Sequence, residues 1–560
     1  MTAEGQALTQ RPPRRWLGLV LGACAGLAWF AARGGLAVLP PGRLDWLLGG
    51  DPSANLTGWL HFRIAPWTWP LGSAPGLVYP LGASVATTDG IPWFAVIGKL
   101  LSPVLPADFQ YLGLYLGLSF TLQGVMGAHL TSLVSDRLVD QALGGAAFAV
   151  APVLFARLGH TSLCGQWPVL LALDANLRPQ ADRRQAARTA ALLAGALFYV
   201  SGVQPYLACM IFPFTLSFLW TCARERVVRW PWAAAAGGVM AAILVGTFLL
   251  FGFLGGSEPT GIEGFGIYQA DVLSLVNSAG RSRFLPPIPA TPRQWFEGFG
   301  YLGLGVLGLL AALGGALAAR RRLPAGWRRI LPVTVVALGW FFYSLSGKVT
   351  LAGREVLDLD GAYSHISVIT SALRTSGRFV WPLHYLLTAA AVLGWLRWQR
   401  GRPAVAAAGL ALAVALQVAE MLPPATIAEI TAGPRTMYPP PDPAPWKALG
   451  RYEHLALVPA RYGVQPAPWE MRLHAALAYV AYHLGATFNG GFTARMRHEQ
   501  AVALSQALQA EVATGTLRPN TLYVFWPPIP PRDGWRCRVV EGFQACDAAT
   551  AALSGSPPGN

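Results

Sequence analysis

Charged residues are scarce in this 560-residue chain. They make up only 12% of the sequence, whereas apolar residues make up 53% and the mean hydropathy is +0.41. A soluble domain carries about 25% charged residues. We therefore expect most of the chain to lie in lipid, which excludes a wholly soluble protein.

Motifs for soluble nucleotides and for common catalytic centres are also missing. The sequence contains no Walker loop, no dinucleotide-binding fingerprint, no serine elbow and no metal-ligand cluster. The net charge of +15 does not indicate a nucleic-acid partner, because the arginines stand in short clusters between apolar runs. That arrangement is typical of cytoplasmic loops in membrane proteins.

The basic clusters predict a topology. The first apolar run, Trp16 to Leu39, follows Arg11, Arg14 and Arg15, which puts the N-terminus in the cytoplasm. The later basic clusters all fall on that same side, which predicts about eleven transmembrane helices. A cleaved signal peptide is the alternative for the first run, although the run is long for one. Residues 91–105 are short and broken by prolines, which favours an interfacial or re-entrant helix.

The predicted fold is an all-α polytopic membrane protein with a small α+β domain. The transmembrane domain spans 1–424 and has long outer loops at 40–109, 256–299 and 347–379. The extracytoplasmic domain spans 425–553 and includes a stiff proline linker at 439–441. Residues 554–560 are predicted to form a disordered tail. The predicted location is the inner membrane of a bacterium.

The first outer loop contains two carboxylates. Asp51 follows the first span by about a dozen residues, and Asp89 ends the polar part of the loop. Transfer of a group to a hydroxyl needs a carboxylate that accepts the proton. Both residues are therefore candidate catalytic residues, with Arg63 as a candidate substrate-binding cation. For Asp51, a turn or cap residue before Pro52 is an equally weighted alternative.

Basic residues in the second and third outer loops run against the topological bias. A lipid-linked phosphate would explain them, and lipid headgroups or pairing with Glu297 are the alternatives. Arg378 begins a span, where an unpaired charge is costly, so it is the leading candidate for a phosphate ligand. The candidate substrate-binding residues of these loops are Arg281, Glu297, Tyr301, Arg374 and Arg378.

Cys537 and Cys546 are the only cysteine pair in the predicted outer domain. We predict that they form a disulfide, provided that the domain faces an oxidising compartment. His160 is predicted to lie in a solvated outer turn, where it could contact substrate. No residue cluster has the spacing of a metal site.

Several short motifs resemble a family of bacterial inner-membrane proteins without an assigned activity. They are Gly50-Asp51-Pro52, Thr88-Asp89-Gly90-Ile91-Pro92, Glu297-Gly298-Phe299 and Ser376-Gly377-Arg378-Phe379. The resemblance covers nearly the whole chain. The family layout is similar to that of the GT-C glycosyltransferases, which use polyprenyl-phosphate sugars. The pair of neighbouring acidic residues usual in their first outer loop is absent here.

The resemblance implies a glycosyltransferase that moves a sugar from a polyprenyl-phosphate carrier to an extracytoplasmic glycan or lipid acceptor. Asp51 would be the base, Asp89 a second carboxylate that orients the acceptor or a divalent metal, and Arg378 the main phosphate ligand. The alternatives are a transporter or flippase for a lipid-linked envelope precursor, and a non-catalytic envelope assembly protein. Neither the sugar nor the oligomeric state follows from the sequence.

Overall fold

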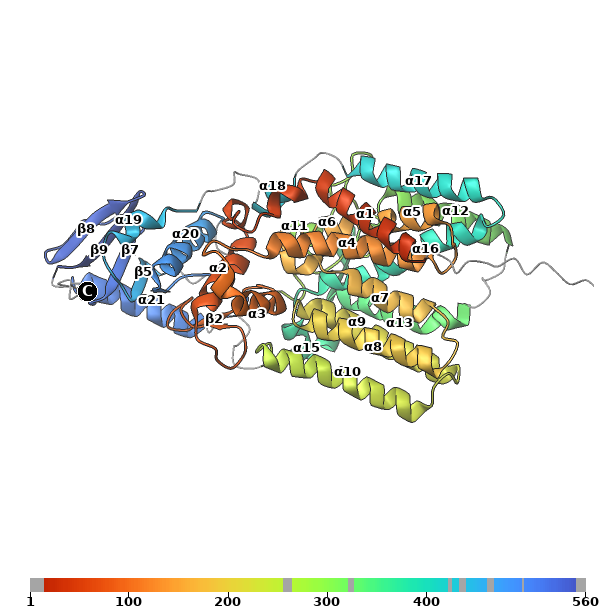
Figure 1. Cartoon of the computed structure of the whole chain (residues 1–560), viewed down its shortest axis with the longest axis horizontal. Coiled ribbons are helices and arrows are strands. Elements are labelled where there is room, and N and C mark those ends of the chain that lie inside the picture. Colours follow the sequence, from red (N-terminus) through yellow and green to blue (C-terminus); the bar gives the residue numbers. More distant parts are fainter. Residues whose placement is uncertain are drawn as a thin grey trace, which may run out of the picture.

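The computed structural model describes residues 15–254, 264–320, 327–421, 426–432, 440–460, 468–495 and 498–549. The basic residues Arg11 and Arg14 and the predicted disordered tail at 554–560 lie outside this range. The described chain is mostly helical, with a small sheet domain at its C-terminal end (Figure 1).

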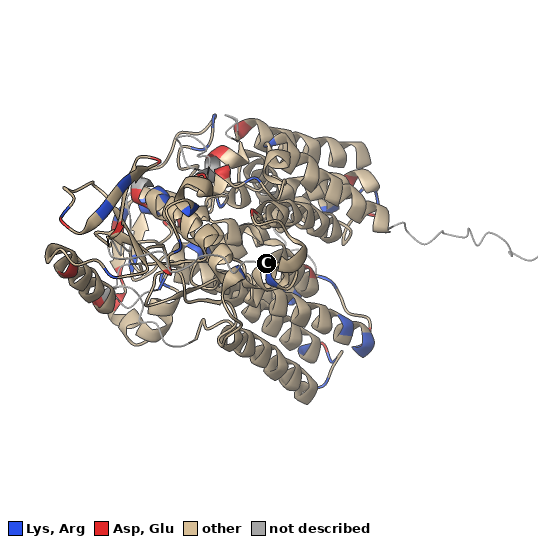
Figure 2. Cartoon of the chain, turned by 60° about the vertical axis from the view of Figure 1, so that its left-hand side comes forward, with Lys and Arg blue, Asp and Glu red and all other residues tan. Residues whose placement is uncertain are grey.

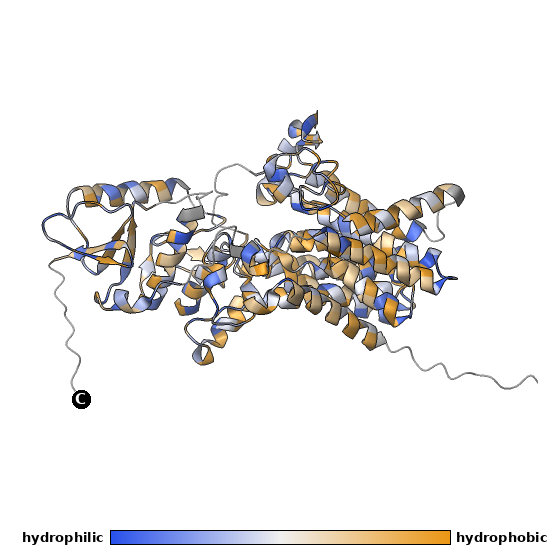
Figure 3. Cartoon of the chain, turned by 90° about the horizontal axis from the view of Figure 1, so that it is seen from above, coloured by the Kyte–Doolittle hydropathy of each residue, from blue (hydrophilic) through white to orange (hydrophobic). Residues whose placement is uncertain are grey.

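Eleven helices of eleven or more residues form one bundle. They are α1 (Arg15–Ala32), α4 (Leu112–Thr131), α5 (Leu138–Ala149), α7 (Trp167–Leu177), α8 (Arg183–Ser201), α9 (Pro205–Arg224), α10 (Trp230–Leu250), α12 (Leu304–Arg320), α13 (Trp327–Ser344), α16 (Trp381–Trp398) and α17 (Pro403–Glu420). Most residues along the bundle helices are hydrophobic (Figure 3). Charged residues are few there and lie mainly toward the helix ends (Figure 2).

Four stretches of the described chain are helical, long and apolar enough to cross a membrane. They are Pro205–Arg224, Trp230–Leu250, Ser376–Trp398 and Pro403–Glu420, and two shorter apolar helices are Trp16–Ala32 and Leu304–Ala318. This count is lower than the predicted eleven spans. Part of the reason is that α5 and α7 have only 12 and 11 residues, about 16–18 Å of helix. The hydrocarbon core of a bilayer is about 30 Å thick.

Shorter elements connect the bundle helices. They are the α-helices α2 (Pro52–Ile64), α3 (Pro92–Leu100), α6 (Pro152–Phe155), α11 (Pro292–Phe296), α14 (Asp360–Ser364), α15 (Ser367–Ala372) and α18 (Ile427–Ala432), the 3-10 helices η4 (Thr161–Cys164) and η5 (Ser376–Val380), and the hairpins β1 (Ser73–Ala74)–β2 (Ala83–Ser84) and β3 (Lys348–Leu351)–β4 (Arg354–Asp358). The segment predicted to be an interfacial helix contains α3, whose Ile97 and Leu100 are exposed.

The C-terminal domain is a five-stranded mixed sheet with helices. Its strand order is β6-β5-β7-β9-β8, and β5 is parallel to both of its neighbours. The elements are α19 (Pro443–Lys447), β5 (His454–Val458), α20 (Pro468–Leu484), β6 (Thr487–Phe488), α21 (His498–Ala513), β7 (Thr521–Phe525), β8 (Trp535–Val540) and β9 (Phe543–Ala548).

The first long loop fills the space between the bundle and this domain. Helices α2 and α3 lie between the two bodies (Figure 1), and α2 packs on α20. Leu77 of the loop pairs in parallel with Phe488 at the sheet edge, and His61 bonds to the carbonyl of Ala478 at 2.9 Å. We call the end of the bundle that meets α2 and α3 the domain end.

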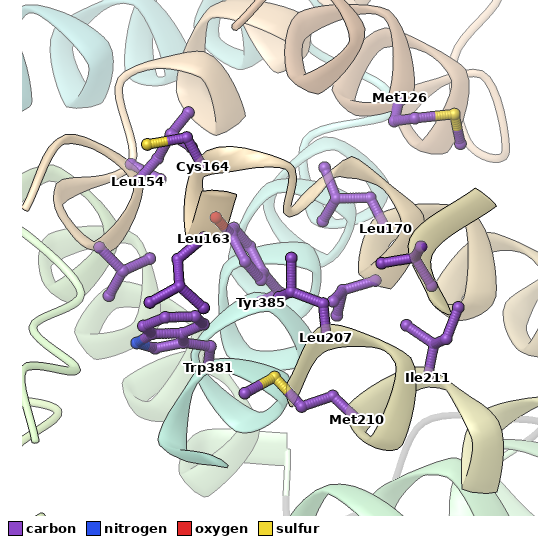
Figure 4. Close-up of a cluster of buried hydrophobic side chains, with 14 of the residues drawn as sticks. Met126, Leu154, Leu163, Cys164, Leu170, Leu207, Met210, Ile211, Trp381 and Tyr385 are labelled. Carbon is purple, nitrogen blue, oxygen red and sulfur yellow. The ribbon is translucent and has the colours of Figure 1, made fainter. Parts of the chain in front are cut away.

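A continuous apolar core supports the domain end from within the bundle. Leu163 of η4 and Leu207 of α9 pack together with Trp381 and Tyr385 of α16 (Figure 4). All four side chains are almost fully buried. This packing holds η4 and the start of α16 in place. It therefore also positions the charged residues that precede them, His160 and Arg378.

Candidate functional site

Asp51 stands immediately before Pro52, at the N-terminus of α2. Its side chain caps no backbone N–H of this helix. Instead, its Oδ2 lies 2.8 Å from Nδ1 of His160, and 48% of the side chain remains exposed. The contact with His160 sets Asp51 apart from a simple turn residue before a proline.

The imidazole of His160 lies between two carboxylates. Its other nitrogen, Nε2, is 3.1 Å from Oε1 of Glu297. Burial alone would lower the pKa of His160, but Asp51 and Glu297 together raise it to about 9. The ring is therefore protonated at neutral pH and can donate to both acids.

Glu297 is the centre of the cluster. Nε and Nη2 of Arg378 lie 2.8 and 2.9 Å from its two oxygens, and Nη1 of Arg157 lies 2.9 Å from Oε2. Burial alone would raise the pKa of Glu297. Arg378, Arg157 and the hydrogen bond from His160 outweigh it and hold this pKa well below its usual value. A carboxylate that is surrounded in this way stays ionised.

Two glycines let the chains that carry Glu297 and Arg378 meet. A Cβ on Gly377 would lie 2.7 Å from Cα of Gly298, and a Cβ on Gly298 would lie 2.2 Å from the carbonyl oxygen of Gln269. These approaches leave no room for a side chain. The ion pair between Glu297 and Arg378 thus depends on backbone contact between their two loops.

Asp89 enters the cluster from the other end of the first loop. Its backbone is left-handed, with φ of 53°, and the amide of Asn55 donates to the carbonyls of Thr88 and Asp89 at 2.9 and 2.7 Å. The carboxylate receives one long contact, at 3.4 Å, from Nε2 of Gln204. Burial raises the pKa of Asp89, although His160 and Arg378 oppose the effect.

Close packing fixes the loop around Asp89. A Cβ on Gly58 would lie 1.9 Å from Oγ1 of Thr88, so α2 can approach the loop only because this residue is glycine. The hydroxyl of Tyr111 donates to the carbonyl of Gly90 on the other side. A non-glycine residue with positive φ persists when its surroundings determine it in this way.

The C-terminal domain reaches the same loop. The N–H of Ala494 donates to the carbonyl of Thr87 at 2.7 Å, and the carbonyl of Ala494 accepts from Nη2 of Arg374 at 3.3 Å. Thr87 lies two residues before Asp89, and Arg374 lies four residues before Arg378. One residue of the domain, Ala494, therefore contacts both loops, and it contacts the second loop through Arg374.

Two other predicted substrate-binding residues lie outside the cluster. The guanidinium of Arg63 donates to four carbonyls near the end of the first long loop, those of Ser102, Leu105, Pro106 and Ala107. It therefore links α2 to the later part of the same loop. Tyr301 donates to the buried Glu420, which also accepts from the N–H of Leu304. Both side chains already have structural partners.

The cluster includes two residues that sequence reasoning did not assign to it. Arg157 was not considered at all, and His160 was interpreted mainly as a solvated turn. Arg157 ends an apolar run on the predicted outer side, where the topological bias disfavours a basic residue. The same signal that identified Arg378 was therefore available for Arg157.

Some predicted features have a direct structural description. Cys537 and Cys546 face each other on β8 and β9 and are joined by a disulfide, with their Cα atoms 4.1 Å apart. Within the described residues, no group of three or more His, Cys, Asp or Glu side chains could hold a metal ion.

Comparison with known proteins identifies the family. The model of a domain of unknown function, DUF6311, matches residues 23–422, and that of the DUF6311 C-terminal domain matches residues 445–548. The chain belongs to the DUF6311 family. No curated protein matches the chain. The two matched regions correspond to the helical bundle with its loops and to the sheet domain.

Proposed function

We propose that this DUF6311 protein is a membrane glycosyltransferase. It would move a sugar from a polyprenyl-phosphate carrier to a glycan or lipid acceptor on the outer side of a bacterial inner membrane. The observation that carries the proposal is the meeting of Asp51, Asp89 and Arg378 at the domain end, although they lie far apart in sequence. A carboxylate can accept the proton of the acceptor hydroxyl, and fixed cations can stabilise the departing phosphate.

The charge balance supports an anionic substrate. Arg157, Arg378 and protonated His160 supply three positive charges, whereas Glu297 and Asp51 supply two negative charges. When Asp89 is ionised as the base, the nearby Arg281, whose charge acts on Arg157, still leaves one positive charge in excess. Buried charges are stable when they are paired, so the surplus positive charge favours a negatively charged ligand.

The contacts distinguish the roles of the two aspartates. His160 lowers the pKa of Asp51 against the effect of burial, which makes Asp51 a weak base. Asp89 has a raised pKa and, among the described residues, a single long side-chain contact. A general base works best when its pKa lies near the working pH. We therefore assign the base to Asp89 and the orientation of His160 to Asp51.

In the proposed step, the acceptor oxygen forms a bond to the anomeric carbon of the sugar. The bond from that carbon to the phosphate oxygen breaks, and its electron pair leaves with the phosphate. The hydroxyl proton passes to the Asp89 carboxylate. Attack from the face opposite the phosphate inverts the anomeric configuration.

The position of the cluster favours a transferase over a transporter. Transporters gather ionisable residues and broken helices near the membrane midplane. Here the charged residues lie in loops and at helix ends on one side of the bundle. As part of the proposal, the helical bundle spans the membrane, the N-terminus is cytoplasmic and the C-terminal domain is external.

Release of polyprenyl phosphate tests the reaction. The full chain, reconstituted in vesicles, would receive polyprenyl-phosphate hexoses and a bacterial envelope extract as the acceptor source. We expect release by the wild type and a loss of about 10²–10⁴-fold in Asp89→Asn, the usual share of a general base. Arg63→Gln is the control, and we expect it to keep its turnover. Undiminished release by Asp89→Asn would remove the catalytic assignment.

Reporter fusions test the orientation. A phosphatase that is active only outside the cytoplasm would be fused after residue 430. The proposal requires an active phosphatase there and an inactive one at the loop between α8 and the preceding helix α7. The reverse pattern would contradict the proposed orientation.

A further inference from the structure

Arg157 has a hydrogen-bonding edge that no group of the described residues occupies. The side chain is fully buried, and its Nη1 contacts Glu297 at 2.9 Å. Its Nε and Nη2 are buried and have no hydrogen-bond partner among the described residues. A buried polar group without a partner destabilises the folded state, and a charged group does so more strongly. Such an edge in a stable site therefore indicates a ligand.

Arg378 shows which ligand this edge takes. Its own Nε and Nη2 hold the two oxygens of Glu297 at 2.8 and 2.9 Å. This planar pair of donors matches the spacing of two oxygens in a carboxylate or a phosphate. In Arg157 the same two nitrogens remain available, because Glu297 is met through Nη1.

Aromatic rings keep the Arg157 guanidinium in place. Its Cζ lies 4.8 Å from the centre of the Phe296 ring and 5.5 Å from that of Trp381. Stacking on aromatic faces fixes the plane of a guanidinium. The edge is therefore held in position before a ligand arrives, which reduces the entropic cost of binding.

A second cation lies along the same loop. The guanidinium of Arg281 is 4.8 Å from the centre of the Phe299 ring, and its charge acts on Arg157. Burial lowers the pKa of Arg281. In the described part of the chain, no carboxylate lies within ion-pair distance of Arg281. Arg157 thus lies over Phe296 and Arg281 over Phe299, so the two guanidiniums flank residues 296–299.

We propose that Arg157, through its Nε–Nη2 edge, and Arg281 together bind a phosphate group. The inference rests on the proposed function and assigns the donor phosphate to this pair. Arg378 is then a positioning residue, because its fork already holds Glu297. A phosphate carries more negative charge and more acceptor oxygens than a carboxylate, which suits two cations.

Lipid binding to the full chain in nanodiscs tests the assignment. The probes are a polyprenyl phosphate without sugar and the matching polyprenol without phosphate, and native mass spectrometry measures occupancy. We expect the phosphate lipid to bind at least about tenfold more tightly than the polyprenol. Arg281→Gln should reduce this difference roughly tenfold or more, as should Arg157→Lys, which keeps the charge and loses the fork.

Arg283→Gln is the matched control, because Arg283 lies in the same loop and is exposed. It should bind both lipids like the wild type. Inorganic phosphate should compete with the phosphate lipid in the wild type and not in Arg281→Gln. Equal binding of the two lipids, or equal effects of the Arg281 and Arg283 variants, would overturn the site.

The outcome separates this site from the proposed function. Phosphate-dependent binding without sugar transfer would keep the site and remove the glycosyltransferase. Sugar transfer that is unchanged in Arg281→Gln and Arg157→Lys would keep the glycosyltransferase and remove the site.

Discussion

Arg378 binds Glu297 through two parallel hydrogen bonds, with Nε and Nη2 at 2.8 and 2.9 Å from the carboxylate oxygens. Glu297 in turn contacts His160, which contacts Asp51. Arg378, which lies 81 positions away from Glu297, is therefore connected to Asp51 of the first long loop through Glu297 and His160. Because Glu297 contacts Arg157, His160 and Arg378, we expect its loss to disturb the positions of all three side chains.

Glu297→Gln should destabilise the protein by about 3–5 kcal/mol, because Arg157 and Arg378 would stay buried without their counter-charge. Unfolding in a mixed-micelle denaturant titration measures the change. Glu355→Gln is the control, since its ion pair with Lys348 is 3.7 Å long and half exposed. We expect that variant to lose about 0–1 kcal/mol. Equal losses in the two variants would contradict a central role for Glu297.

The stability should depend on pH through His160. The pKa of this group is raised to about 9 in the folded protein from an ordinary value of 6.5. Its contribution is thus fully present below about pH 6.5 and is lost as the pH rises through 9. We expect the wild-type thermal midpoint to fall across this interval and to fall less in His160→Gln. Parallel curves would show that the ion pairs of His160 do not stabilise the fold.

Gly58→Ala should disturb the Asp89 loop. The added Cβ would lie 1.9 Å from Oγ1 of Thr88, and forced overpacking of this kind costs about 1–3 kcal/mol. Hydrogen exchange of the amides of 84–91 should increase. Gly195→Ala, on α8, is the control, because its Cβ would meet nothing within 4 Å. Unchanged exchange in Gly58→Ala would mean that the loop can move aside freely.

Reduction of the Cys537–Cys546 disulfide should weaken the C-terminal domain. The bond closes a loop of nine residues between β8 and β9. In the chain-entropy model this is worth about 2–3 kcal/mol. The Cys537→Ser, Cys546→Ser double variant should show faster exchange in 535–548 while α16 is unaffected. Identical exchange with and without the disulfide would refute the stabilising role.

The residues that sequence reasoning placed in the site share one property. Asp51, Asp89 and Arg378 each stand beside an apolar run, where a charge needs a reason. Pattern alone could therefore find them. It could not find that Arg378 is already held by Glu297, because that contact joins two loops through the glycines at 298 and 377.

The remaining site residues depended on information that only the fold contains. Arg63 has the same local appearance as a ligand-binding cation, yet carbonyls of the loop after α3 surround it. His160 looked like a solvated turn because its partners lie 109 and 137 positions away in sequence. The helices α5 and α7 are also shorter than the apolar pattern suggested. The chain between them forms the short helices α6 and η4, and the turn that joins these two carries Arg157 and His160.

Ala494 joins the C-terminal domain to the two loops that carry Asp89 and Arg378. Its N–H contacts the loop of Asp89, and its carbonyl contacts Arg374 on the loop of Arg378. A displacement of Ala494 would act on both loops through these two hydrogen bonds. The position of the sheet domain is therefore coupled through a single residue to the spacing of the Asp89 and Arg378 loops.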